Sequence, residues 1–133
     1  MPKPVSPNGT TKQMKSITRY DAFDKGDIVL LPFPFTNLKT TKRRPGLVIS
    51  PKVFNKSGDS TILFMTSNVA TLPKEGDVLV SQFKSAGLPK PTLVRMKFVT
   101  IANALILKKI GRLPAADMKR VKAQVMRFFG MSD

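Results

Sequence analysis

The sequence predicts a β-rich α+β fold, a set of short strands followed by one amphipathic helix. Apolar runs of strand length, such as IVLLPFPF and STILFMTS, lie between turn signals rich in Gly, Asp and Pro. The 11 prolines and 8 glycines favour short elements joined by many turns over a helical bundle. A helical period occurs only in the last segment. At 133 residues the chain has the length of one domain.

The first expected strand, IVLLPFPF, follows the turn signal DKGD. Its prolines, Pro32 and Pro34, cannot donate ladder hydrogen bonds, so the strand must end at an edge or a corner of the sheet. A polar, basic loop at 36–44 leads to the second strand, PGLVISP at 45–51. The basic loop therefore joins two core strands.

The third expected strand is STILFMTS, which follows the turn at 56–59 and ends in the hydroxyl pair Thr66 and Ser67. Further strands are expected at 78–83, 92–96 and 98–107, and 85–91 reads as a loop. The chain has no internal repeat of the kind that marks a solenoid or a propeller.

The helix is predicted by apolar residues at positions i, i+3, i+7 and i+10, namely Met118, Val121, Val125 and Phe128. Pro114 suits its first turn, Asp117 lies near the positive end of its dipole, and Gly130 is placed to end it. We expect this helix to cover the sheet.

Residues 1–23 are expected to be a flexible, basic N-terminal tail, because they are polar and lack any period. Residues 24–133 then form a single domain. The chain has no apolar run of the roughly 20 residues that span a bilayer, and no signal-peptide pattern. The expected location is therefore the cytoplasm.

The charge balance favours a polyanionic partner. The chain has 23 Lys and Arg against 8 Asp and Glu, a net charge of +15. It lacks an amphipathic helix of the membrane-binding type, which favours nucleic acid over lipid. An acidic protein partner fits the same charge equally well.

The chain contains neither cysteine nor histidine, which excludes Ser/His/Asp and Cys/His nucleophilic machinery. The eight carboxylates are scattered among expected turns and ends, so we expect no metal site. Phosphate-binding Gly-rich motifs are absent, and we expect no cofactor. Arginine, lysine and hydroxyl groups remain. They suit RNA cleavage, because RNA carries its own nucleophile, the 2′-hydroxyl, and needs mainly orientation and charge stabilisation.

Arg43 and Arg44 immediately precede the second expected strand, which would hold them on a rigid base. Arginine can bind phosphate oxygens through two parallel hydrogen bonds and stays charged at any working pH. From composition alone, a pair of ordinary solvated loop residues remains the simpler interpretation.

The order GDIVLLPFPFTNL, KRRPGLVISPKVFN and ILFMTS, continued to the C-terminal helix, resembles the MazF/PemK family of toxin endoribonucleases of type II toxin–antitoxin systems. The resemblance covers about residues 25–130. It implies an SH3-like, partly open β-barrel of the CcdB/MazF type with a C-terminal α-helix. It also implies a homodimer, a single-stranded RNA (mRNA) substrate cut to a cyclic phosphate, and an acidic cognate antitoxin.

By this resemblance the catalytic residues are Arg44, Thr66 and Arg95. The expected RNA-binding residues are Lys42, Arg43, Ser67 and Lys97. Members that carry an arginine at the position of Arg95 usually follow it with Ala or Cys and then Asp, whereas this chain has Met96 and Lys97. A carboxylate that could accept a proton is therefore missing from this motif. Another group accepts the proton, with neutral Lys97 as one candidate, or the reaction relies on electrostatics alone.

Two other functions remain open. CcdB-like gyrase poisons share this fold, but they end in a segment that contains tryptophan, and this chain has none. A non-catalytic nucleic-acid-binding barrel would need aromatic side chains exposed beside the cations, with Phe33 and Phe35 as candidates.

Overall fold

The computed structural model describes residues 23–33, 42–70 and 73–131. Most of the expected tail, Pro34, Phe35 and most of the expected basic loop lie outside these ranges. Six strands form one antiparallel sheet in the order β4-β5-β3-β2-β1-β6. The strands are β1 (Asp27–Phe33), β2 (Lys42–Val48), β3 (Asp59–Thr66), β4 (Val78–Leu79), β5 (Leu93–Ala102) and β6 (Lys108–Arg112).

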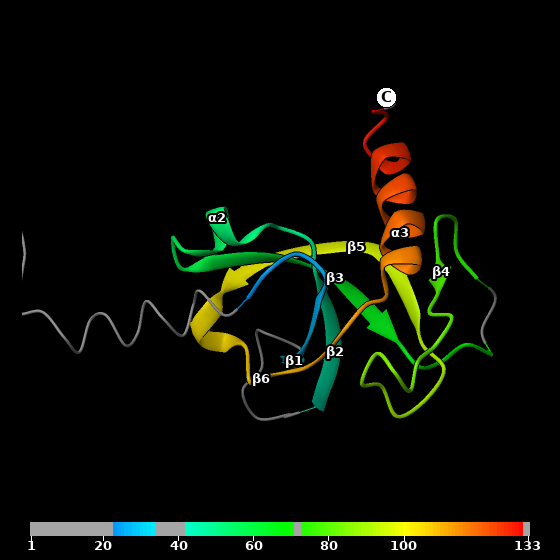
Figure 1. Cartoon of the computed structure of the whole chain (residues 1–133), viewed down its shortest axis with the longest axis horizontal. Coiled ribbons are helices and arrows are strands. Elements are labelled where there is room, and N and C mark those ends of the chain that lie inside the picture. Colours follow the sequence, from blue (N-terminus) through cyan, green and yellow to red (C-terminus); the bar gives the residue numbers. More distant parts are fainter. Residues whose placement is uncertain (1–22, 34–41, 71–72, 132–133) are drawn as a thin grey trace, which may run out of the picture.

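The sheet curls into a half-barrel, with β4 and β6 as its two edges (Figure 1). The helices are α2 (Lys52–Asn55), the 3₁₀ turn η1 (Asn103–Leu105) and α3 (Ala115–Phe128). Helices α2 and α3 lie at opposite ends of the molecule. This is the partly open barrel with a C-terminal helix that the sequence predicts. Within the described ranges, no helix combines the length and the apolar character required to cross a bilayer.

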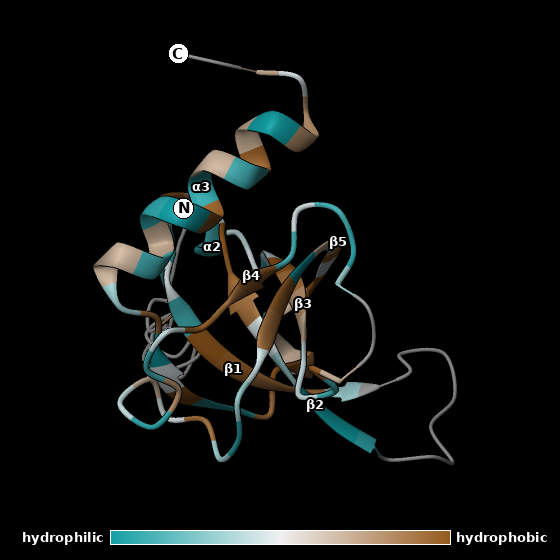
Figure 2. Cartoon of the chain, turned by 90° about the vertical axis from the view of Figure 1, so that its right-hand side faces the viewer, coloured by the Kyte–Doolittle hydropathy of each residue, from teal (hydrophilic) through white to brown (hydrophobic). Residues whose placement is uncertain are grey.

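Two apolar clusters lie on the two faces of the sheet, because successive residues of a strand point to opposite faces. Leu47 and Leu63 pack with Val121 of α3 in one cluster. Val48 and Ile62 belong to the other cluster. Phe23, at the expected boundary between tail and domain, is buried in this second cluster. Figure 2 shows the apolar character of β1 and the hydrophilic start of β2.

Helix α3 confirms the predicted helix. Pro114 occupies its N-cap position, and Gly130 follows its end with φ +69°. Asp117, in the first turn, is buried and accepts hydrogen bonds from the backbone N–H and the hydroxyl of Ser81, both at 3.1 Å. It also pairs with Arg120. This carboxylate therefore fastens the start of α3 to the segment after β4.

Strand β2 begins at Lys42, three residues before the predicted start at Pro45. It pairs with β1 as far as Lys42 opposite Phe33, whereas pairing with β3 begins only at Gly46. A proline is tolerated at position 45 because β2 has a neighbour on one side only there. The prediction for Pro32 is confirmed, since β6 pairs with β1 only as far as Leu30.

The strand predicted at 78–83 is wrong beyond residue 79. Val80 still donates its N–H to the Thr92 carbonyl, at 3.0 Å. The next backbone N–H, that of Ser81, donates to the Asp117 carboxylate instead of to a strand. Residues 81–87 form turns.

The strands predicted at 92–96 and 98–107 are a single strand, β5, that ends at Ala102. Asn103 ends it because its side chain is buried and donates to the Asn55 carbonyl at 2.8 Å. Strand β6 was not predicted from the sequence. This edge strand lacks an apolar alternation and is fastened by Asp27, which Arg112 contacts at 2.6 Å and Lys109 at 3.2 Å.

Candidate functional site

A pocket of about 610 Å³ opens at the end of the sheet near α3. Its walls come from the start of β2, the end of β3, the turn before β4, the middle of β5 and the end of α3. Four cationic and two acidic side chains line it: Arg44, Lys74, Arg95, Lys97, Glu75 and Asp77. The excess of cations suits an anionic ligand.

Arg44 and Thr66 meet in this pocket through the register of β2 and β3. The pairing continues from Val48 opposite Ile62 to Gly46 opposite Phe64. The pairing ends there, and continuing the same register by two residues brings Arg44 to the level of Thr66; both line the pocket. Arg44 is exposed. The Thr66 hydroxyl accepts a hydrogen bond from the backbone N–H of residue 68, at 3.1 Å, and keeps its own hydrogen for donation.

Arg95 and Lys97 enter the pocket from a bulge in β5. On β3 only Phe64 lies between residues 63 and 65, which pair with residues 98 and 94 of β5. On β5 the same interval holds residues 95–97. The extra residues bend the strand, as β-bulges do near functional sites. The ammonium of Lys97 lies 5.4 Å from the centre of the Phe64 ring.

Asp77 brings a carboxylate to the pocket from the edge of the sheet. Strand β4 pairs Val78 with Val94, so the preceding residue, Asp77, comes opposite Arg95. Asp77 Oδ2 lies 3.5 Å from Arg95 Nη2, and the two side chains are 3% and 20% exposed. Arg95 therefore has a carboxylate beside it in space, from the residue that precedes β4, although its own motif carries none.

The turn that carries Asp77 is closed by two hydrogen bonds. The Asp77 N–H donates to the Lys74 carbonyl at 3.0 Å, and the Lys74 N–H donates to Asp77 Oδ2 at 2.7 Å. Gly76 has φ +88°, and a Cβ there would lie 2.8 Å from Met96 Cγ. Only glycine allows both this backbone conformation and this close approach to β5.

Helix α3 braces the same turn from outside. Arg127 pairs with Glu75 and also donates to the Gln124 side chain, at 2.8 Å. Phe128, which is 55% exposed, lines the pocket and packs against Phe98 with ring centres 4.9 Å apart. The turn thus lies between β5 and the last turn of α3, and it contacts both.

Two buried side-chain atoms of the described residues have no hydrogen-bond partner, Asp77 Oδ1 and Arg95 Nε. Both belong to the ion pair in the pocket. Buried polar groups in native proteins are nearly always paired, and exceptions gather at functional sites. These atoms mark the place where the pocket has unused hydrogen-bonding capacity.

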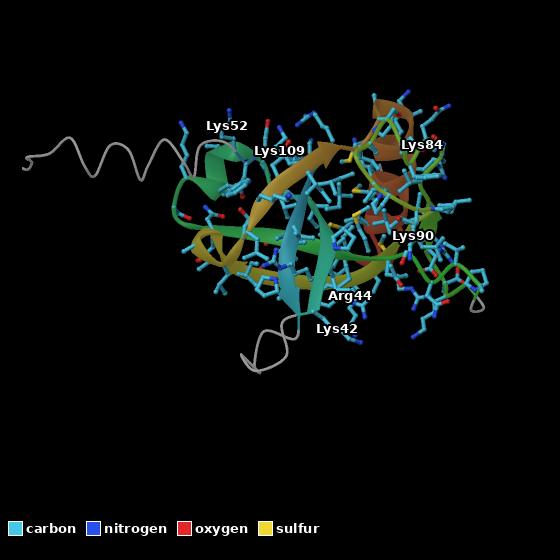
Figure 3. All side chains as sticks on the ribbon, turned by 90° about the horizontal axis from the view of Figure 1, so that it is seen from below. Lys42, Arg44, Lys52, Lys84, Lys90 and Lys109 are labelled. Carbon is cyan, nitrogen blue, oxygen red and sulfur yellow. The ribbon has the colours of Figure 1, made fainter. Side chains whose placement is uncertain are left out.

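The structure brings four of the expected site residues together: Arg44, Thr66, Arg95 and Lys97 line the pocket, whereas Lys42, Arg43 and Ser67 do not. Arg43 points to the opposite face of β2 from its two neighbours. Figure 3 shows Lys42 and Arg44 on one side of the molecule, with Lys52 and Lys109 on the opposite side.

Sequence reasoning missed the pocket residues Lys74, Glu75, Asp77 and Phe128. No sequence signal marks Asp77, because its position beside Arg95 follows from the pairing of Val78 with Val94 in the folded sheet. In the described part of the chain, no three His, Cys, Asp or Glu side chains are placed to hold a metal ion. The two carboxylates of the pocket each face an arginine.

A comparison with models of known protein families finds a match over most of this chain. Residues 24–129 match the model of the PemK-like, MazF-like toxins of type II toxin–antitoxin systems. No curated protein matches this chain in sequence.

Solved structures share the fold at low sequence identity. A mycobacterial endoribonuclease in complex with its cognate antitoxin has a TM-score of 0.67 at 15% identity, over 84% of this chain and 97% of that one. MazE–MazF from Deinococcus radiodurans gives 0.66 at 22% identity, over 83% and 97%. The toxin MazF-mt6 of Mycobacterium tuberculosis gives 0.65 at 19% identity, over 80% and 99%.

Proposed function

Because this chain belongs to the family of PemK-like, MazF-like toxins of type II toxin–antitoxin systems, we propose that its pocket binds single-stranded RNA and cuts it without a metal ion. As a member of this family, the chain is a toxin endoribonuclease of a toxin–antitoxin pair. The proposal adds the site, the mechanism and the residues. The observation that carries it is the convergence of Arg44, Thr66, Arg95 and Lys97 on one pocket.

In the proposed reaction the 2′-oxygen attacks the adjacent phosphorus, and the bond from phosphorus to the 5′-oxygen of the next nucleotide breaks. The 2′-hydroxyl gives up its proton to solvent water, and the leaving 5′-oxygen takes one from solvent water. The products are a 2′,3′-cyclic phosphate and a 5′-hydroxyl end. Negative charge develops on the phosphate oxygens during this step, and fixed cations stabilise it.

Arg44 and Arg95 supply the charge stabilisation. A guanidinium fits two phosphate oxygens at once and keeps its charge at any pH at which RNA survives. The hydroxyl of Thr66 can donate a further hydrogen bond to the phosphate or the sugar. Each of the two pocket carboxylates already faces an arginine. The mechanism that these side chains support is therefore stabilisation of the phosphate charge by the protein's own cations.

The decisive experiment incubates the purified protein with a long single-stranded RNA in EDTA. Cleavage to cyclic-phosphate ends is expected, and RNA with 2′-deoxyribose at the cut position should resist. Arg44→Ala should lower cleavage by about 10²- to 10³-fold. Arg43→Ala is the matched control, since it removes the same charge from the neighbouring residue outside the pocket. Equal losses in both variants would show that only general charge matters.

The partners follow from the family and the surface. We propose that an acidic segment of the cognate antitoxin covers the cationic pocket. We also propose a homodimer, because Phe128, Phe129 and Met131 at the end of α3 are 55%, 55% and 62% exposed. Light scattering at micromolar concentration tests the dimer. A cytoplasmic location, where mRNA is found, completes the proposal.

A second function, RNA binding without cleavage, is favoured by the exposed ring of Phe128 beside the cations of the pocket. Such a ring can stack on a base. Filter binding measured beside the cleavage assay separates the two functions. A protein that only binds RNA would retain it on the filter and leave it intact.

A further inference from the structure

We infer that Asp77 is a positioning residue that holds the Arg95 guanidinium against the RNA phosphate. This inference rests on the proposed function and extends it to a residue outside the motif in which Arg95 lies. Its basis is a cross-strand ion pair between the short edge strand β4 and the bulge of β5.

Burial and register make the pair a fixed part of the pocket. Asp77 is 3% exposed, and Arg95, its partner at 3.5 Å, is 20% exposed. The hydrogen bond from the Lys74 N–H and the close packing of Gly76 on Met96 restrict the Asp77 carboxylate to this place. A charge held this firmly can set the direction of a long arginine side chain, which would otherwise sample many rotamers.

The separation of the two groups leaves the arginine available to a ligand. At 3.5 Å the charges attract, and the Arg95 side chain stays 20% exposed in the lining of the pocket. By contrast, Arg112 donates directly to Asp27 at 2.6 Å and also to the Lys25 carbonyl. Arg112 uses its donors within the protein, whereas Arg95 is oriented by charge and keeps donors for phosphate oxygens.

Orientation matters because the gain in rate comes from donors already aimed at the charge of the transition state. Without its acidic partner, Arg95 could still attract RNA but would spend part of its time turned away from the phosphate. The effect should therefore fall on kcat more than on KM.

The test compares Asp77→Asn with Asp59→Asn. Both variants remove one carboxylate charge, but Asp59 is exposed at the start of β3, outside the pocket. Asp77→Asn should lower kcat for RNA cleavage by about 10- to 100-fold and change KM by less than about threefold. Asp59→Asn should leave both constants within about twofold.

A double-mutant cycle with Arg95→Ala separates positioning from general support of the fold. If Asp77 acts through Arg95, Asp77→Asn should cost less than about threefold once Arg95 is gone. Losses that multiply in the double variant would overturn the inference, and so would an unchanged kcat in Asp77→Asn. If Asp77→Asn does not fold, Asp77→Glu keeps the charge at a shifted position. A lowered kcat at constant KM would then support the inference, and wild-type kinetics would overturn it.

The outcomes also separate this inference from the proposed function. If the wild-type protein leaves single-stranded RNA intact, both fail. If the wild-type protein cuts RNA and Asp77→Asn cuts it equally well, only the role of Asp77 fails. Thermal unfolding of every variant shows that the compared proteins are folded.

Discussion

At the end of the sheet near α2, buried polar side chains are fully paired. Asn55 donates to the Ser50 and Phe23 carbonyls at 2.8 and 3.3 Å, and its oxygen accepts from the Ser50 hydroxyl at 2.5 Å. Asn103 donates to the Asn55 carbonyl and accepts from the Ser60 hydroxyl, also at 2.5 Å.

At the pocket end, Asp77 and Arg95 are paired by charge and each keeps an unpartnered atom. Satisfied networks raise stability, whereas incomplete ones cost free energy and persist where a ligand completes them. The comparison therefore predicts that substitutions near α2 will lower stability, and that substitutions in the pocket will lower activity.

The largest expected effect comes from replacing the pocket pair with apolar residues, Asp77→Leu together with Arg95→Met. Cleavage should fall by about 10³-fold, because the oriented cation is lost. The free energy of unfolding should stay the same or rise by about 1–4 kcal/mol, because no charge remains buried. RNA cleavage assays and urea unfolding measure the two effects. A large drop in stability would contradict the comparison.

The second-largest effect is expected for Asn103→Ala, which removes a buried amide side chain. The Asn55 carbonyl and the Ser60 hydroxyl would lose their partner, which should lower the free energy of unfolding by about 2–4 kcal/mol. Cleavage by the folded fraction, assayed well below the melting temperature, should match the wild type. Reduced activity in the fully folded variant would show that the two ends are coupled.

Asp27→Asn is expected to cost less. The carboxylate is buried, but its partners Arg112 and Lys109 are 56% and 45% exposed and can be solvated. The free energy of unfolding should fall by about 1–2 kcal/mol, and high salt should shrink the difference between variant and wild type. Urea unfolding at two salt concentrations measures this. An effect independent of salt would argue against a role of charge.

The smallest effect concerns Asp24. Its pKa is lowered mainly by the hydrogen bond from the backbone N–H of Lys52, and further by that of Lys25. A lowered pKa stabilises the fold above the unfolded-state pKa of about 4, and this stability is lost as the pH falls through the folded-state pKa. Asp24→Asn should therefore remove about a few tenths of a kcal/mol at pH 7, and less as the pH falls below about 4. Melting temperatures across that range test the sign.

The sequence was sufficient to predict the first three strands, the last helix and the fold class, because apolar periods and turn residues mark them directly. It was not sufficient for β6, since KKIGR has no apolar alternation and is held by Asp27, which is far away in the chain. The strand expected at 78–83 failed because the Asp117 carboxylate takes the N–H of Ser81. Tertiary contacts decided these cases.

For the site, Arg44 and Thr66 could be placed from the order of the strands and the family resemblance. Asp77 could not. Its position depends on the register of a two-residue strand and on a bulge in β5, and neither has a sequence signature of its own. Whether an arginine in a motif has a carboxylate partner is therefore decided by the folded structure and not by its neighbours in the sequence.

The bracing of the Lys74–Asp77 turn by Arg127 has a consequence for the timing of synthesis. Arg127 lies 52 residues after Glu75, and β1 is fastened to β6 by an interaction across 85 residues. The contact of β1 with β6 needs Arg112, and the contact of Glu75 with Arg127 cannot form until the ribosome has made the last helix. A growing chain therefore has no finished pocket until the residues of α3 have been synthesised.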